Sequence, residues 1–195
     1  FVGNTNYLPE IYSLGHRNQL GLAFHPETGD LWASENGPQG GDEVNIIKSG
    51  RNYGWPIASY SREYRGTWVS DTPWLAAFEE PEVTWWPSIA PSGLTFYTGE
   101  QFPEQYQNSA FVALHGSINR LDLVGYSLVR IPFENGRPSG PPEDFLTGFI
   151  VRNDEEKEVW GRPVDVLQSA DGSLLISDDA GNRIFRVWYS GGGPS

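Results

Sequence analysis

The sequence predicts an all-β fold built from repeated antiparallel strand meanders. Three segments share one layout: a short apolar strand, a connection, a second apolar strand, a polar loop and a third strand. In the first and third segments the connection is a short turn with glycine and aspartate. Their first strands begin near residues 21, 93 and 165, so the repeats are evenly spaced. Almost no helix is expected, because no stretch sustains the 3.6-residue periodicity of an amphipathic helix.

The first repeat spans residues 20–56. Its first two strands, Leu20–Phe24 and Leu31–Ala33, flank a turn-forming stretch, and Val44–Ile47 forms the third strand. A short strand is also expected at Ile11–Leu14. Residues 57–87 are predicted to form a long aromatic loop that either covers one end of a sheet or lines a ligand site.

The second and third repeats lie near residues 88–133 and 163–190. In the second, the expected strands are Gly93–Phe96, Phe111–Leu114, Ile118–Leu123 and an outer strand, Tyr126–Phe133. In the third, they are Asp165–Gln168, Leu174–Ser177 and Arg183–Tyr189. Two of the second strands are apolar on both faces, which is typical of strands between neighbouring β-propeller blades. We therefore interpret residues 1–195 as part of a propeller.

Composition excludes several classes of function. The formal net charge is −12, which argues against nucleic acid and anionic membranes as partners, because both need clustered Lys and Arg. There is no cysteine, hence no disulfide and no thiolate metal site. No apolar run reaches the ~20 residues of a membrane span, and no signal-peptide pattern opens the sequence.

Polar residues recur directly after the second strand of each repeat. In a propeller these loops surround one mouth of the channel, where a binding site is expected. Arginines precede the first and third repeats at Arg17 and Arg162, and two guanidinium groups at one mouth suit a polyanionic ligand. The loop residues are Asn36-Gly37-Pro38, His115-Gly116-Ser117 and Asp178-Asp179-Ala180.

Several of these groups have more than one interpretation. The loop from Gly37 to Glu43 offers backbone and carboxylate oxygens that suit Ca²⁺, or it is a solvated turn. His115 is a general base, a cofactor contact or a structural residue. Asp178-Asp179 fits a hairpin turn, and His25 fits turn architecture. No Ser-His-Asp arrangement, Walker loop or dinucleotide fingerprint is visible.

Long motifs resemble the soluble PQQ-dependent glucose/sorbosone (aldose, pyranose) dehydrogenases. The resemblance implies a six-bladed propeller, of which this chain supplies about three four-stranded blades from the carboxy-terminal half. It also implies a periplasmic or secreted protein. The motifs are GHRNQLGLAFHP (15–26), SENGPQGGDEVNII (34–47), GRNYGWP (50–56), WWPSIAPSG (85–93), FVALHGSINR (111–120), DFLTGF (144–149), WGRPVDV (160–166) and DDAGNRIFRV (178–187).

The resemblance also implies cofactors and site residues. PQQ is expected to contact Arg17, Asn18, His115 and Arg162. The backbone carbonyls of Gly37 and Pro38 are expected to bind the Ca²⁺ held with PQQ, and Glu43 and Tyr53 a second, structural Ca²⁺. The implied activity is oxidation of an aldose or pyranose at its anomeric carbon. The family's histidine base belongs to the amino-terminal half, so His115 is the one catalytic candidate in this chain.

Two other functions remain open on the sequence: a non-catalytic propeller module or inactive fragment, and a Ca²⁺-dependent lactonase-type propeller. The lactonase type would need a side-chain metal cage, whereas this loop offers mostly backbone oxygens. Because three blades do not close a ring, we expect completion by the amino-terminal half or by a second copy in a homodimer.

Overall fold

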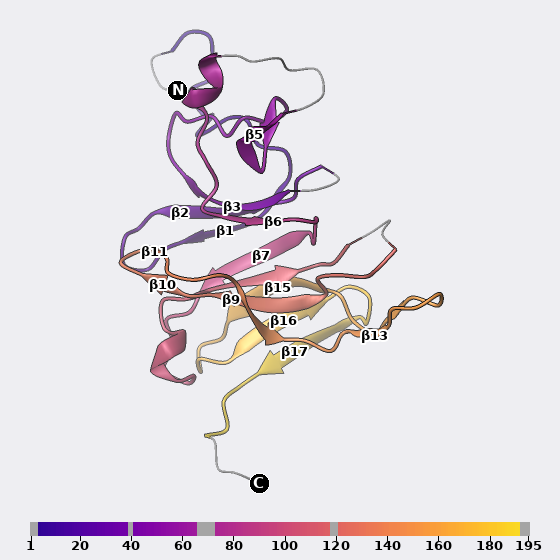
Figure 1. Ribbon diagram of the computed structural model, residues 1–195. Helices are drawn as coiled ribbons and strands as arrows, with labels where there is room; N and C mark the ends of the chain where they lie inside the picture. Colours follow the sequence, from indigo (N-terminus) through magenta and orange to yellow (C-terminus); the bar gives the residue numbers. More distant parts are fainter. Residues whose placement is uncertain (1–3, 39–40, 66–72, 118–120, 192–195) are drawn as a thin grey trace.

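The computed structural model describes residues 4–38, 41–65, 73–117 and 121–191. Three antiparallel sheets stack face to face (Figure 1). In the described ranges the helices are two short 3₁₀ segments, η1 (Pro73–Ala77) and η2 (Glu104–Tyr106), which confirms the expectation of almost no helix. None of the described helices is long and apolar enough to cross a membrane.

Sheet I has the order β1 (Gln19–Phe24), β2 (Leu31–Glu35), β3 (Asp42–Ile47) and β6 (Val83–Trp85). The expected long loop therefore supplies a fourth strand, and it also holds the hairpin β4 (Ala58–Ser59)–β5 (Ser61–Arg65). The strand expected at Ile11–Leu14 is wrong. Leu14 forms an isolated bridge to Asn52, and the Tyr12 carbonyl accepts one hydrogen bond from the Gly50 nitrogen (2.7 Å), but this pairing with residues 50–53 is too short to form a strand.

Sheet II has the order β7 (Pro91–Phe96), β8 (Ala110–Leu114), β9 (Ser127–Ile131) and β12 (Glu143–Leu146). Ile118–Leu123 is not the third strand: residues 118–120 lie outside the described residues, and 121–123 are not in a strand. Gly125 and Tyr126 adopt positive φ angles of 81° and 54°, which break an extended chain, so the third strand begins at Ser127.

Sheet III has three strands, β15 (Pro163–Gln168), β16 (Leu174–Asp178) and β17 (Arg183–Val187). The expectation of four strands in each blade is thus wrong for this sheet within the described residues. Two further hairpins project from the stack, β10 (Phe133–Glu134)–β11 (Arg137–Pro138) and β13 (Ile150–Arg152)–β14 (Glu158–Val159).

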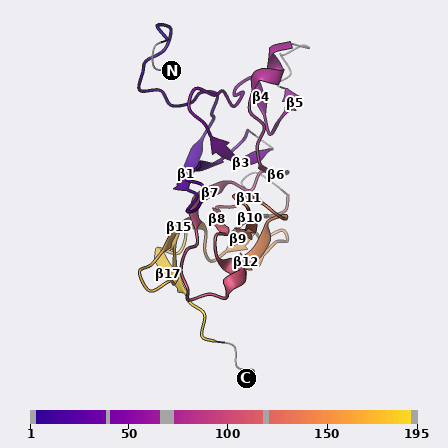
Figure 2. The same ribbon diagram turned by 90° about the vertical axis from the view of Figure 1, so that its left-hand side faces the viewer.

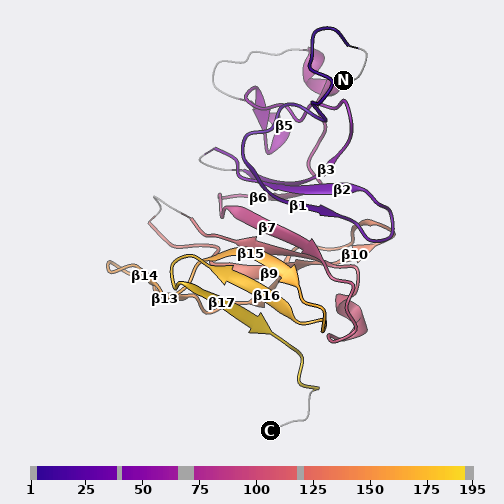
Figure 3. The ribbon, with the colours of Figure 1, turned by 180° about the vertical axis from the view of Figure 1, so that it is seen from behind.

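The first strands of the three sheets lie next to one another along one side of the stack. Figure 2 shows β1, β7 and β15 on this side and the outer strands β6 and β12 on the other. Figure 3 shows the same succession from behind. The three strands begin at residues 19, 91 and 163, which confirms the even spacing predicted from the sequence.

Glycines permit the close approach of these first strands. A Cβ atom on Gly21 would lie 2.4 Å from the Ser92 carbonyl oxygen and 2.7 Å from the Leu94 nitrogen. A Cβ on Gly93 would lie 2.4 Å from the Asp165 Cα. Both separations are shorter than non-bonded contacts allow, so the glycine at the third position of β1 and of β7 sets the spacing between the sheets.

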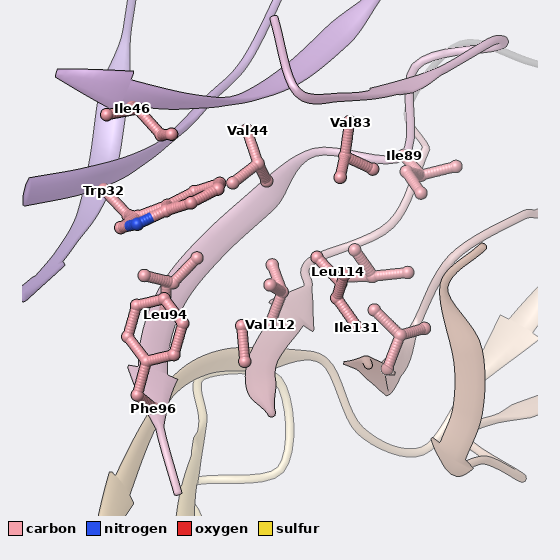
Figure 4. Packing of buried hydrophobic residues seen from close by; sticks show 12 residues of the cluster. Trp32, Val44, Ile46, Val83, Ile89, Leu94, Phe96, Val112, Leu114 and Ile131 are labelled. Atoms are coloured by element: carbon pink, nitrogen blue, oxygen red, sulfur yellow. The ribbon is translucent and has the colours of Figure 1, made fainter. Parts of the chain in front are cut away.

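Two apolar layers join the sheets. Between sheets I and II, Trp32, Val44 and Ile46 face Leu94 and Val112 (Figure 4). The second layer lies between sheets II and III and contains Phe111, Leu128, Leu174 and Ile176. Strand β8 is buried along its whole length and contributes to both layers, as its continuous apolar sequence predicts.

The two ends of the stack expose apolar side chains. Sheet I presents Leu20, Leu22 and Phe24 from β1, and sheet III presents Leu167 and Ile184. These residues alternate along their strands with residues that pack inward. A folded domain seldom leaves two apolar sheet faces uncovered, so both ends of the stack have the character of interfaces.

Asp42 ties sheet I to sheet II. Its side chain is fully buried, and Oδ1 accepts hydrogen bonds from the Gly37 backbone nitrogen (2.9 Å) and the Ser88 hydroxyl (2.7 Å). Oδ2 accepts from the backbone nitrogens of Ile89 (2.6 Å) and Ala90 (2.8 Å). One carboxylate thereby satisfies four donors and fixes where the chain enters β7.

We expect Asp42→Ala to lower the free energy of unfolding by about 3–5 kcal/mol, because each buried donor left without a partner costs about 1–3 kcal/mol. Asp42→Asn retains one acceptor oxygen and should cost less. Urea denaturation followed by tryptophan fluorescence measures both. The control is Asp122→Ala, an exposed carboxylate expected to change stability by less than about 0.5 kcal/mol. An Asp42→Ala loss no larger than that of the control would contradict this role.

Candidate functional site

The residues predicted to contact PQQ and its Ca²⁺ gather along one edge of the stack, where first strands begin and second strands end. We call it the mouth edge. One backbone hydrogen bond recurs there in each sheet, from the residue after the second strand to the residue before the first. The pairs are Asn36 N to Asn18 O (2.9 Å), His115 N to Ala90 O (2.9 Å) and Asp179 N to Arg162 O (3.4 Å). Arg162 is thus equivalent to Asn18 rather than to Arg17.

In sheet I, Arg17 lies beside the loop that follows β2. Its Nη1 donates to the Asn36 carbonyl oxygen at 2.9 Å, and its guanidinium carbon lies 5.5 Å from the centre of the Trp55 ring. The Arg17 backbone nitrogen donates to the buried Glu35 carboxylate. The guanidinium group is exposed and held at one position, as an anion-binding group should be.

Glu35 is itself held by a histidine that the sequence analysis left unassigned. Glu35 Oε2 lies 3.1 Å from His16 Nδ1, and His16 Nε2 lies 2.8 Å from the Ser13 hydroxyl. The His16 ring stacks on Tyr53 with 4.5 Å between ring centres. A Ser-His-Glu hydrogen-bonded set is therefore present, where the sequence showed no such arrangement. In the structure it supports the backbone of Arg17.

Sheets II and III contribute an ionic cluster. Asp179 accepts hydrogen bonds from Arg162 Nε (2.7 Å) and Nη2 (3.0 Å), and its Oδ2 lies 3.1 Å from His115 Nε2. The hydrogen bond from Arg162 holds the pKa of Asp179 below its ordinary value, and the same bond raises the pKa of Arg162. The structure thus brings together two predicted residues, His115 and Arg162, through a third that the sequence analysis treated as part of a turn.

The neighbouring Asp178 shapes the loop. It is buried, and its Oδ1 accepts from the backbone nitrogens of Arg162 (2.8 Å), Ala180 (3.0 Å) and Gly181 (2.9 Å). This confirms the turn interpretation for Asp178 but not for Asp179. Asp178 Oδ2 is buried without a hydrogen-bond partner among the described residues.

The mouth edge is one connected network rather than three separate loops. Asp42 joins the Gly37 nitrogen to the Ala90 nitrogen, and the Ala90 carbonyl accepts from the His115 nitrogen. His115 then contacts Asp179, which holds Arg162. The positions of the guanidinium groups and of the Gly37-Pro38 loop are therefore fixed by the same set of hydrogen bonds.

The loop from Asn36 to Pro38 offers neutral oxygens suited to a hard cation. Asn36 Oδ1 is buried and has no hydrogen-bond partner among the described residues, an unmet acceptor beside the carbonyls of Gly37 and Pro38. Amide and carbonyl oxygens are ligands that Ca²⁺ accepts. Within the described ranges no cluster of three or more His, Cys, Asp or Glu residues could hold a metal. A cation at this loop would depend on such neutral oxygens.

Glu43 and Tyr53, the other predicted metal pair, lie on the face of sheet I that points away from sheet II. They line a narrow crevice, too tight to admit a water molecule, together with Ser59, Tyr60 and Glu79. Burial raises the pKa of the Glu43 carboxyl group, whose oxygens accept from Asn45 Nδ2 (2.9 Å) and the Tyr60 nitrogen. Burial also raises the pKa of Tyr53 to about 12, and its hydroxyl donates to the Ile46 carbonyl.

Of the two carboxylates beside this crevice, Glu79 already pairs with Lys48 Nζ (3.1 Å) and Arg51 Nε (3.5 Å). A bound cation would therefore offset the cost of ionising Glu43 but is not needed by Glu79. The Tyr53 hydroxyl already bonds β3, so the tyrosine would offer its backbone oxygen.

Comparison with known proteins identifies the family. Residues 1–186 match the family described as Glucose / Sorbosone dehydrogenase. The chain belongs to this family. An uncharacterised protein from Synechocystis is 47% identical over 187 residues, covering 93% of this chain and 39% of that protein.

Solved structures agree. A glucose dehydrogenase crystal structure superposes with a TM-score of 0.75 at 32% identity, covering 97% of this chain and 50% of that one. A PQQ-bound aldose sugar dehydrogenase from Streptomyces coelicolor gives 0.61 at 29% identity, covering 94% and 44%. The sheets of this member of the glucose/sorbosone dehydrogenase family thus match about half of a complete enzyme, and the chain spans half or less of these relatives.

The Asp179 cluster predicts a pH response. In the folded protein we expect the Asp179 carboxyl group to titrate below its ordinary range, since Arg162 stabilises the ionised form. The stabilisation is present at neutral pH and is lost only as the pH falls through this lowered pKa. The ¹³C shift of the side-chain carboxyl group followed by NMR measures the titration midpoint.

Arg162→Met should move that midpoint up toward the ordinary value. Arg183→Met is the matched control, because Arg183 bonds the Gly181 carbonyl and does not contact Asp179. An Asp179 midpoint that is unchanged by Arg162→Met would contradict the ion pair.

Proposed function

We propose that this chain forms the cofactor-holding half of a PQQ- and Ca²⁺-dependent dehydrogenase that oxidises an aldose or pyranose sugar at its anomeric carbon. The observation that carries the proposal is the mouth edge itself. Arg17 and Arg162, an imidazole and an oxygen-rich loop lie along one hydrogen-bonded network, in a chain whose family includes a PQQ-bound aldose sugar dehydrogenase. When bound, PQQ would accept the two electrons removed from the sugar.

Arg17 and Arg162 would bind the acid groups of the cofactor. Both guanidinium groups are already oriented, Arg17 by the Asn36 carbonyl and Arg162 by Asp179. Prior orientation lowers the entropic cost of fixing a long side chain on binding. Asn18 stands beside Arg17 and contributes a neutral polar group.

Ca²⁺ would be held by the carbonyls of Gly37 and Pro38, with Asn36 Oδ1 as an additional oxygen ligand. The unpartnered Asn36 oxygen is the structural observation that supports this assignment. The divalent ion would supply Lewis-acid polarisation beside the cofactor. Glu43 and the Tyr53 backbone would hold a second ion with a structural role.

His115 would act as a hydrogen-bond acceptor toward the bound ligand. Asp179 is ionised at neutral pH and can only accept, so His115 Nε2 must carry the proton in this pair. In the neutral ring Nδ1 is then unprotonated and free to accept a hydroxyl or N–H proton. We assign no residue of this chain as the base that removes the substrate proton.

The proposal predicts saturable, Ca²⁺-dependent PQQ binding by the purified chain. Arg17→Ala and Arg162→Ala should each weaken binding at least tenfold, about 1.4 kcal/mol, because each removes a charge-assisted contact. Asn36→Ala should raise the Ca²⁺ concentration needed for half-maximal binding. Calorimetry and absorbance titrations measure both effects.

Arg152→Ala is the matched control, since Arg152 pairs with Glu156 and Glu158 on the β13–β14 hairpin. It should bind PQQ as the unchanged chain does. An absence of PQQ binding at any Ca²⁺ concentration would favour the non-catalytic binding module over the dehydrogenase.

We also propose that the exposed apolar ends of the stack are covered in the working protein, by further blades or by a second copy. Light scattering on the purified chain should give the mass of a dimer if a second copy covers them. Leu22→Glu, which places a charge in the exposed face of sheet I, should then return the mass to that of a monomer. A monomer at high protein concentration would reject the homodimer and leave further blades as the cover.

A further inference from the structure

The side chain of Glu35 joins the two parts of the mouth edge in sheet I. One part is Arg17, and the other is the loop from Asn36 to Pro38, which follows Glu35 directly in the chain. Glu35 is the last residue of β2, its side chain is buried, and one of its oxygens accepts from the Arg17 backbone nitrogen. A residue at the end of β2 thus reaches the segment that precedes β1.

Strand pairing does not position Arg17. β1 begins at Gln19, and within the described residues the Arg17 nitrogen donates to no backbone carbonyl. The nearest backbone hydrogen bond between these segments, from the Asn36 nitrogen to the Asn18 carbonyl, stops one residue short of Arg17. The Glu35 side chain continues the connection to the residue whose guanidinium group stands at the mouth edge.

Arg17 is held at both of its ends by consecutive residues. Its backbone nitrogen donates to the Glu35 carboxylate, and its Nη1 donates to the Asn36 carbonyl oxygen at 2.9 Å. Because Asn36 also opens the loop that offers oxygens to a cation, the position of Glu35 sets where Arg17 stands relative to that loop.

His16 and Ser13 hold the Glu35 side chain in this position. Glu35 Oε2 lies 3.1 Å from His16 Nδ1, and His16 Nε2 lies 2.8 Å from the Ser13 hydroxyl. A carboxylate only accepts hydrogen bonds, so the proton of the neutral ring is on Nδ1, and Nε2 accepts from Ser13. The ring also stacks on Tyr53 with 4.5 Å between ring centres, which limits its rotation.

We propose that Glu35 is a positioning residue that couples an anion site at Arg17 to a cation site at the loop from Asn36 to Pro38. His16 and Ser13 hold it in place, and Glu35 itself would touch neither ligand. A ligand at either site would order the shared link, so each ligand would raise the affinity for the other. The inference rests on the proposed function in one respect, because it takes PQQ and Ca²⁺ as the two ligands.

The first test needs no ligand and observes the ring ¹⁵N signals of His16 at a pH where the ring is neutral. In the unchanged chain we expect the proton on Nδ1. In Glu35→Gln the amide oxygen still accepts from the Arg17 nitrogen, and the amide NH₂ donates to His16 Nδ1, so the ring proton should move to Nε2. A proton on Nε2 in the unchanged chain would overturn the proposal.

Glu35→Ala removes the acceptor and tests the positioning itself. The ¹⁵N relaxation of Arg17 Nε should then show a mobile guanidinium group, whereas Glu35→Gln should keep this group ordered. We call the factor by which saturating Ca²⁺ raises PQQ affinity the Ca²⁺ factor, and calorimetric titrations measure it. Glu35→Ala should weaken PQQ binding about tenfold and lower the Ca²⁺ factor about fivefold. Glu35→Gln should stay close to the unchanged chain in both.

Two further variants separate positioning from stability. His16→Phe keeps a ring against Tyr53 but removes the hydrogen bond to Glu35, and it should lower the Ca²⁺ factor less than Glu35→Ala does. It carries the same test if Glu35→Ala does not fold. Val129→Ala is the control for lost stability alone, because Val129 is buried in the apolar layer on β9. It should lower the free energy of unfolding and leave the Ca²⁺ factor unchanged.

An ordered Arg17 side chain or an unchanged Ca²⁺ factor in Glu35→Ala would overturn the proposal. A Ca²⁺ factor that falls equally in Val129→Ala would also overturn it, because lost stability alone would then explain the effect. If the unchanged chain binds no PQQ at any Ca²⁺ concentration, the proposed function fails instead. The order of the Arg17 side chain then still decides whether Glu35 positions it.

Discussion

The buried carboxylate of Asp42 is the constraint on which the site depends. It belongs to sheet I and connects that sheet to sheet II, because it accepts hydrogen bonds from the loop after β2 and from the residues that precede β7. A side chain with two acceptor oxygens can satisfy four donors that no strand pairing reaches. One residue thereby fixes the distance between the Gly37-Pro38 loop and the His115 loop. The apolar layer between the sheets holds the two sheets together but does not by itself set the position of these loops.

Close packing of the first strands supplies the second constraint. Gly21 lies against the backbone at Ser92, and Gly93 against that of Asp165, so each sheet approaches the next at the edge that carries the site. Away from these glycines, bulky side chains fill the space between the sheets, and Trp32 and Phe96 hold sheets I and II apart. The sheets therefore converge along β1, β7 and β15, which brings polar groups from three repeats to one mouth edge.

The sequence predicts this arrangement where the signal is local or periodic. The turn at Thr28-Gly29-Asp30 and the even repeat spacing locate β1, β7 and β15, and the placing of Arg17 near Asn36 follows from antiparallel pairing. Ile118–Leu123 competes with β9 for the third position in the second repeat because each has three apolar residues, and β9 lies within the segment expected as the outer strand, Tyr126–Phe133. The break that decides between them is the left-handed backbone at Gly125 and Tyr126.

The roles of the acidic residues depend on tertiary contacts and could not be predicted from the sequence. Asp178 and Asp179 are adjacent and chemically alike, yet one accepts from three backbone nitrogens and the other pairs with Arg162 and His115. Likewise Asp42, read as part of a loop suited to Ca²⁺, uses its oxygens on N–H and hydroxyl donors. Which role an acidic residue takes depends on the donors that the fold brings to it.

These roles decide the charge of the mouth edge. Arg17 and Arg162 stand there with four carboxylates, namely Glu35, Asp42, Asp178 and Asp179, so the formal charge of the edge is negative despite its arginines. Three of the four carboxylates are buried and accept hydrogen bonds from backbone N–H groups. Replacing any of these three would remove the hydrogen bonds that hold a loop. A polyanionic cofactor would meet net repulsion at such an edge. A divalent cation on the neutral oxygens of Asn36, Gly37 and Pro38 would bring that formal charge to zero, and it would do so beside Arg17. The fold uses these carboxylates as hydrogen-bond acceptors, so their negative charge stays at the mouth edge. The Ca²⁺ requirement that we propose therefore follows from this charge as well as from the chemistry of the reaction.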